Sequence, residues 1–159
     1  SFPGGRSDPG ESAVQTAIRE AWEEVDLDPA LVEPLGELDH LTTVTRRAYI
    51  VPVVALVARP PELRANPSEV ERVIEVPLDE LMTPGVFREE RWGPPELSRP
   101  VYFFDLHGDT VWGATAALLR QLLALLTGTD PGPPEERDPA RELDETGFQL
   151  GPDGLDGVV

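Results

Sequence analysis

The sequence contains no cysteine, no lysine and no long apolar run, and each absence removes a class of function. Without cysteine the chain can hold no disulfide framework, no thiolate metal site and no cysteine nucleophile. No apolar run approaches the roughly 18 residues of a transmembrane helix, so we expect no membrane span. All 13 basic residues are arginines, against 30 acidic residues. The net charge of −17 argues against a nucleic-acid-binding protein, which needs cations to neutralise phosphates.

The length of 159 residues predicts one folded domain followed by an acidic tail. Residues 129–159 carry nine acids and two arginines, together with many prolines and glycines. Few large apolar residues accompany them, so we expect this tail to be disordered. Residues 1–128 are left as the predicted domain, which is long enough to bury a core.

The spacing of apolar residues in this domain predicts a mixture of helices and strands. Helical spacing covers residues 12–25, with Ser12 as N-cap, and residues 114–126, with Gly128 as the stop. Pro52 interrupts one β-branched run and predicts a bulge or a sheet edge there. Strands are expected over residues 31–44 (with turns), 48–58, 71–76, 101–106 and 110–112. A helical turn is expected over residues 77–82, and an irregular segment over residues 83–100.

The first of these helices carries an unusual charge pattern. Glu20, Glu23 and Glu24 are three and four residues apart and therefore share one face, where Arg19 is the nearby cation. Taken alone, such a row favours a solvated helix surface. Hard divalent cations such as Mg²⁺, however, bind carboxylate oxygens and bring substrate phosphates with them. The glycine-rich loop over residues 3–10 can present backbone N–H groups to a phosphate. Loop and helix together predict metal-assisted attack on a phosphoanhydride.

The order of these residues resembles a known family signature. From Gly5 the sequence runs through five residues to Glu11, then through seven residues to the stretch REAWEEVDL, which begins at Arg19. This pattern is similar to the Nudix box of hydrolases that cleave nucleoside diphosphates linked to another group. One position departs from it, since Asp26 stands where the family has a glycine in a left-handed helix cap. We expect the substitution to cost about 1 kcal/mol and not to abolish activity.

The resemblance implies roles for individual residues. A metal site for Mg²⁺ or Mn²⁺ would comprise Glu20, Glu23, Glu24 and the backbone of Gly5. Gly4 and Glu11 would support it, the latter by pairing with Arg19 or by binding the metal indirectly. Family members often place a further acid on a later loop as base or extra ligand. Glu69 is the first candidate for that acid and Glu71 the second. The implied catalytic residues are Glu23, Glu20, Arg19 and Glu69.

The resemblance also implies a fold. Nudix proteins are α/β/α sandwiches, so we expect a mixed sheet between the helix over residues 12–25 and the helix over residues 114–126. One or more strands normally precede the box in this family, whereas four residues precede Gly5 here. We therefore expect the domain over residues 1–128 to be incomplete at its N-terminal end.

Several shorter stretches are similar to the coenzyme A pyrophosphatase branch of the family. These are FPGG at residues 2–5, NPSEV at 66–70, VPLDEL at 76–81 and VWGAT at 111–115. The implied reaction is hydrolysis of coenzyme A or a derivative to 3′,5′-ADP and 4′-phosphopantetheine. Alternatives are a Nudix hydrolase of ADP-ribose or NADH, or a Nudix-like nucleotide-binding module without turnover. We expect a cytoplasmic protein that binds a small-molecule nucleoside diphosphate, with no nucleic-acid or membrane partner and with homodimer formation left open.

Overall fold

The structure, a computed structural model, describes residues 1–43, 48–57 and 62–129, and the expected acidic tail from residue 130 lies outside this range. Helices and strands follow one another along the chain, which confirms the α/β class predicted from the sequence. The elements are α1 (Ala13–Val25), η1 (Pro29–Leu31), β1 (Val32–Glu37), β2 (Leu41–Thr42), β3 (Tyr49–Ile50), β4 (Val53–Val57), α2 (Leu78–Leu81), β5 (Phe87–Trp92), β6 (Arg99–Leu106), β7 (Asp109–Trp112) and α3 (Gly113–Thr127).

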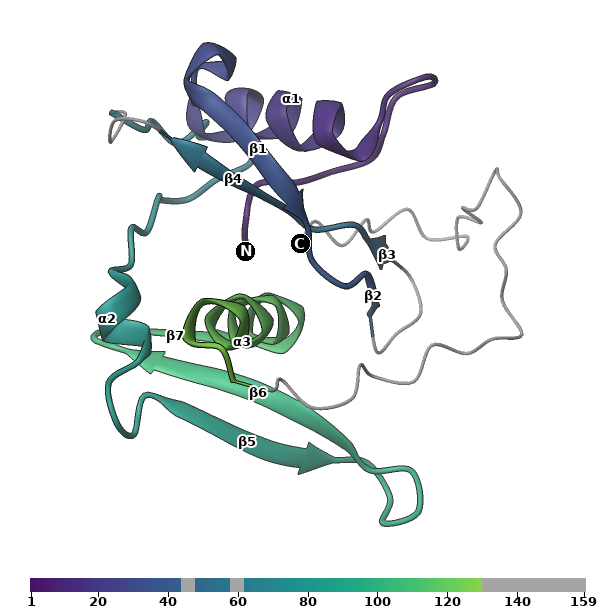
Figure 1. The fold of residues 1–159 in the computed structure, drawn as a ribbon, viewed down its shortest axis with the longest axis vertical. Coiled ribbons are helices and arrows are strands. Elements are labelled where there is room, and N and C mark those ends of the chain that lie inside the picture. The colour runs from purple at the N-terminus through teal and green to yellow at the C-terminus, as the bar shows by residue number, and fades with distance from the viewer. Residues whose placement is uncertain (44–47, 58–61, 130–159) are drawn as a thin grey trace.

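The strands form three small antiparallel sheets. β1 pairs with β4, β2 pairs with β3, and β5, β6 and β7 form a three-stranded sheet in that order. In Figure 1, β1 and β4 lie between α1 and α3, and the three-stranded sheet lies on the other side of α3. The expected helix–strand–helix layering is therefore present. The expected mixed sheet is not, because every pairing among the described residues is antiparallel.

The connections explain why these pairs are antiparallel. The chain between β6 and β7 turns back within His107 and Gly108, and a direct return of this kind cannot join parallel strands. The chain between β1 and β4 likewise returns through the β2–β3 hairpin. The single strand expected over residues 48–58 is instead divided at Pro52 into β3 and β4, which pair in different sheets. The Pro52 carbonyl accepts a hydrogen bond from the Leu38 N–H at 3.0 Å.

The main core lies where α3 covers one face of the three-stranded sheet. Phe104 of β6 is 1% exposed and contacts Ala116 of α3 and Leu81 of α2. Partly buried apolar side chains surround this centre: Val76, Val86, Tyr102, Leu106, Val111, Leu119 and Leu123. Gly128 ends α3 in the left-handed conformation, as predicted. No helix in the described part of the chain is long and apolar enough to cross a bilayer.

Two predictions about the middle of the chain were wrong. Residues 71–76 form no strand, because Ile74 is 47% exposed and the alternation therefore marks no buried face. Residues 83–100, expected to be irregular, contain β5 and the start of β6. The strand β5 was not predicted because most of its residues are charged. Arg88 pairs with Asp105 of β6 at 2.7 Å, and its guanidinium lies 3.9 Å from the centroid of the Phe103 ring.

Candidate active site

The acidic residues singled out in the sequence lie on α1, whose ends are well defined. Ser12 is the N-cap, as predicted, and its side chain accepts from the N–H of Gln15 while the Gln15 side chain accepts from the N–H of Ser12. This reciprocal pair satisfies two N–H groups that a helix start otherwise leaves unpaired. At the other end Asp26 adopts the left-handed conformation, with φ 58° and ψ 31°. The helix therefore ends where the family signature places its glycine.

Arg19 is the centre of the charged network on this helix. Its Nε and Nη2 donate to the two oxygens of Glu11 at 2.9 and 3.1 Å. Its Nη1 donates to Glu20 Oε1 at 2.7 Å and to Glu23 Oε2 at 2.9 Å. A planar guanidinium fixes its partners through several hydrogen bonds at once. Arg19 therefore orients three of the acids in the signature.

Glu11 connects this network to the glycine-rich loop. It accepts from the backbone N–H of Asp8 at 2.9 Å and from Thr16 Oγ1 at 3.0 Å. The Arg19 hydrogen bonds, followed by the bond from Asp8, lower the pKa of Glu11 to about 2. Arg19 also holds the loop directly, because its Nη2 donates to the carbonyl of Arg6 at 2.8 Å. Sequence reasoning missed Thr16, a buried residue of α1 whose Oγ1 also lies 2.8 Å from Ser7 Oγ.

Gly4 and Gly5 of the loop approach two different acids. A Cβ added to Gly5 would lie less than 3.0 Å from all three atoms of the Glu20 carboxyl group. Only glycine therefore lets the Glu20 carboxylate occupy this position against the loop. The N–H of Gly4 hydrogen-bonds Glu24, whose side chain is buried with the residue 6% exposed.

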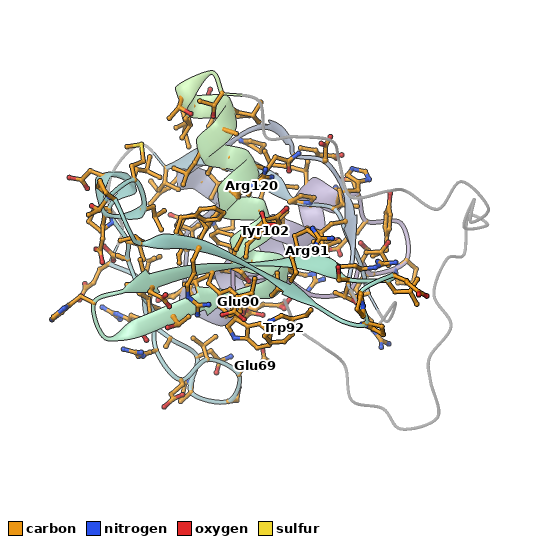
Figure 2. The ribbon with its side chains drawn as sticks, turned by 90° about the horizontal axis from the view of Figure 1, so that it is seen from below. Glu69, Glu90, Arg91, Trp92, Tyr102 and Arg120 are labelled. Carbon is orange, nitrogen blue, oxygen red and sulfur yellow. The ribbon has the colours of Figure 1, made fainter. Side chains whose placement is uncertain are left out.

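Glu24 stands in a strongly acidic environment. Burial raises its pKa most, the hydrogen bond from Gly4 opposes this rise, and the negative charges of Glu20 and Glu69 raise the pKa further. The charge of Glu69 therefore affects the pKa of a residue on α1, although the two residues are more than 40 positions apart in the sequence. Figure 2 shows Glu69 on a loop at the lower border of that view. The structure thus brings Glu69 and the helix acids into one electrostatic neighbourhood. Glu71, the second candidate for the loop acid, is exposed.

A comparison with models of known protein families matches a part of the chain that includes the acidic helix. A family model described as the NUDIX domain matches residues 1–96. The chain belongs to the Nudix family. The match covers the loop, α1 and the segment that carries Glu69, so every candidate site residue lies inside it.

Three curated relatives of this Nudix chain share one name. The chain is 38% identical to "Uncharacterized Nudix hydrolase NudL" from Pectobacterium atrosepticum over 127 residues, which are 76% of this chain and 63% of the relative. It is 36% identical to the protein of the same name from Photorhabdus laumondii, with 76% and 65% covered. A third relative, from Yersinia pestis, is 32% identical, with 76% and 61% covered. The chain thus spans somewhat less than two thirds of the length of these relatives.

Nudix hydrolases generally need divalent metal ions and act on small nucleoside diphosphates. The carboxylates on α1 are of the kind that bind such an ion. Arg19 contacts one oxygen each of Glu20 and Glu23, so the second oxygen of each carboxylate lies outside these ion pairs. Within the described residues, however, no three acidic or histidine side chains already form a ligand cluster. Glu20 and Glu23 are turned toward Arg19, whereas the carboxyl group of Glu24 accepts a hydrogen bond from the Gly4 N–H.

Trp92, which sequence analysis placed in an irregular segment, lies in β5. Its indole Nε1 donates to Glu90 Oε2 at 2.7 Å, and Figure 2 shows these two side chains close together. Its ring contacts Phe103 and Trp112, with centroids 6.0 and 5.9 Å away. The described contacts of Trp92 are therefore with its own sheet.

Proposed function

We propose that this Nudix chain is part of a metal-dependent hydrolase that cleaves the diphosphate of coenzyme A or a derivative. The products would be 3′,5′-ADP and 4′-phosphopantetheine. One observation carries the proposal: the glutamates of the signature gather at α1, with Glu11, Glu20 and Glu23 hydrogen-bonded to Arg19 and with Glu24 buried beside the Gly4 N–H. Such a concentration of negative charge is costly unless a cation compensates it. A helix that served only as a solvated surface would not bury one of these acids.

Glu20, Glu23 and Glu24 would hold the divalent ion, with the backbone of Gly5 beside them. When bound, such an ion neutralises diphosphate charge and lowers the pKa of an attacking water. Arg19 keeps Glu20 and Glu23 aligned through its Nη1, and Glu11 in turn holds Arg19 through two hydrogen bonds.

A carboxylate must also accept the proton of the attacking water. Glu69 is our candidate for this base, because its side chain is exposed while its charge is felt at Glu24.

Coenzyme A is favoured as the substrate by the stretches of sequence quoted above. In the first of two such stretches, residues 66–70, Asn66 hydrogen-bonds the end of α1, and the second, residues 111–115, spans the end of β7 and the start of α3. ADP-ribose and NADH remain alternative substrates. A nucleotide-binding module without turnover is the alternative from a different class of function.

A hydrolysis assay with purified protein distinguishes these functions. Coenzyme A, ADP-ribose and NADH would each be incubated with Mg²⁺ or Mn²⁺, using this chain and the protein encoded by its full reading frame. We expect coenzyme A to be cleaved fastest and Glu23→Gln to reduce the rate about 100-fold or more. Glu33→Gln, which removes the same charge from the exposed surface of β1, is the matched control and should leave the rate unchanged.

The outcomes separate the alternatives. Cleavage of ADP-ribose alone would overturn the coenzyme A assignment and leave the hydrolase. Binding of a nucleotide without cleavage of any substrate by the full-reading-frame protein would establish the binding module instead. An unchanged rate in Glu23→Gln would show that the metal assignment on α1 is wrong.

A further inference from the structure

The C-terminal end of α1 is completed by a segment about 40 residues further along the chain. The last carbonyl groups of a helix have no partner within the helix. Here the N–H of Arg64 donates to the Val25 carbonyl at 2.9 Å, and the N–H of Asn66 donates to the Glu24 carbonyl at 2.8 Å. The side-chain Nδ2 of Asn66 donates to the Glu23 carbonyl at 3.2 Å. Two of these three bonds come from Asn66.

Asn66 also builds the turn that follows it. Its side-chain Oδ1 accepts from the N–H of Ser68 at 3.2 Å and from Ser68 Oγ at 2.8 Å. Its backbone carbonyl accepts from the N–H groups of Glu69 at 3.1 Å and Val70 at 2.8 Å. An asparagine side chain that bonds the backbone two residues on is a common way to form a tight turn.

The side-chain amide of Asn66 therefore bonds α1 through its nitrogen and the following turn through its oxygen. The donor end of the Asn66 side chain bonds the carbonyl of Glu23, a residue whose side chain is a candidate metal ligand. The acceptor end lies on the turn that carries Glu69. No other side chain of similar size does both, because aspartate has no donor and serine is too short to separate donor and acceptor in this way.

We infer that Asn66 is a positioning residue, which fixes Glu69 relative to the acidic face of α1. Its role in turnover rests on the proposed function, but the mechanical connection does not. The electrostatic interaction of Glu69 with Glu24 is the consequence expected of that connection. Asn66 touches neither substrate nor metal in this account, and it acts through the placement of Glu69.

Three variants test the inference. Asn66→Ala removes both ends of the amide, whereas Asn66→Asp keeps an acceptor for Ser68 and loses the donor to Glu23. Arg64→Ala is the matched control from the same segment: its backbone N–H stays, and the ion pair recorded for its exposed side chain is with Glu62. Thermal unfolding would show whether each variant folds. If Asn66→Ala does not fold, the comparison is made with Asn66→Asp.

The first readout is amide hydrogen exchange, which does not depend on activity. We expect the Glu69 and Val70 amides to exchange about tenfold faster in Asn66→Ala, to a smaller extent in Asn66→Asp, and at the parental rate in Arg64→Ala. Unchanged exchange in both Asn66 variants would overturn the inference, because the turn would then be held by something else.

The second readout concerns the site itself. A misplacement of about 1 Å at a catalytic group reduces rates about 100-fold. We expect kcat to fall by about 10- to 100-fold in Asn66→Ala, with KM changed less than threefold. Faster exchange with unchanged kcat would show that the turn does not position Glu69, which also overturns the inference. If the parent cleaves no substrate, the proposed function fails separately, and the exchange measurement decides the role of Asn66.

Discussion

The close approach of Gly5 to Glu20 makes Gly5→Ala the most informative single substitution in this site. A Cβ at Gly5 would lie 2.8 Å from Glu20 Oε2 and closer to the other two carboxyl atoms. Ordinary van der Waals contact begins at 3.4 Å, so Oε1, at 2.3 Å, must retreat by at least 1.1 Å and Oε2 by at least 0.6 Å. The carboxyl group lies at the end of a flexible side chain, and Gly5 has no positive φ. The displacement should therefore cost little stability.

The same displacement should cost much activity. A misplacement of about 1 Å at a catalytic group reduces rates about 100-fold, so we expect kcat/KM to fall by about 10- to 100-fold. We expect the free energy of unfolding, measured in urea, to change by less than about 1 kcal/mol. Parental kcat/KM in Gly5→Ala would refute the reasoning, since Glu20 would then not need this position.

Gly10→Ala is the matched control for this substitution. Gly10 lies in the same loop, has a φ of 89°, and has no atom within 4 Å of an added Cβ. Alanine should therefore destabilise the protein by about 1–2 kcal/mol through backbone strain while leaving kcat/KM unchanged. The two variants thus separate a steric effect on Glu20 from a general effect on the loop.

Further predictions concern the helix and the core. Asp26→Gly should raise the free energy of unfolding by about 1 kcal/mol, because glycine adopts the left-handed cap without strain; equal urea midpoints would contradict this. Glu11 has its pKa lowered to about 2, so its pairing with Arg19 stabilises the fold above pH 4.5 and less as pH falls toward 2. The stability difference between parent and Glu11→Gln should therefore shrink over that interval in urea titrations. Phe104→Ala should cost about 3–5 kcal/mol by the same measurement.

The helices were the most predictable part of the fold. Ser12, the apolar spacing behind it and Gly128 are local signals, and each specifies a helix end without reference to the rest of the chain. Both long helices accordingly appear within about a residue of their predicted bounds.

Strand prediction failed where the decisive contacts are distant in sequence. The charges of β5 resemble a loop until Arg88 is placed over Phe103 and against Asp105. Residues 71–76 resemble a strand until Ile74 is seen to be exposed. Periodicity records which residues are apolar, and it cannot record which surface will be available to cover them.

The residues of the site were likewise predictable only where their contacts are close in sequence. The loop and α1 lie within 27 residues, so spacing alone indicates that Gly5, Arg19 and the acids meet. Thr16 and Asn66 could not be found by this route. Thr16 looks like one more polar helix residue, and the partners of Asn66 lie on a helix about 40 residues away. The tight turn of the NPSEV stretch was the one available signal for Asn66.

The most direct test of the account is whether the acidic face of α1 binds a divalent cation. Mn²⁺ would be titrated into the parent protein, Glu20→Gln, Glu24→Gln and the surface control Glu33→Gln, with binding followed by calorimetry. The account predicts that both α1 variants bind Mn²⁺ at least about tenfold more weakly than the parent, while Glu33→Gln binds as the parent does. Equal affinity in all four proteins would contradict it.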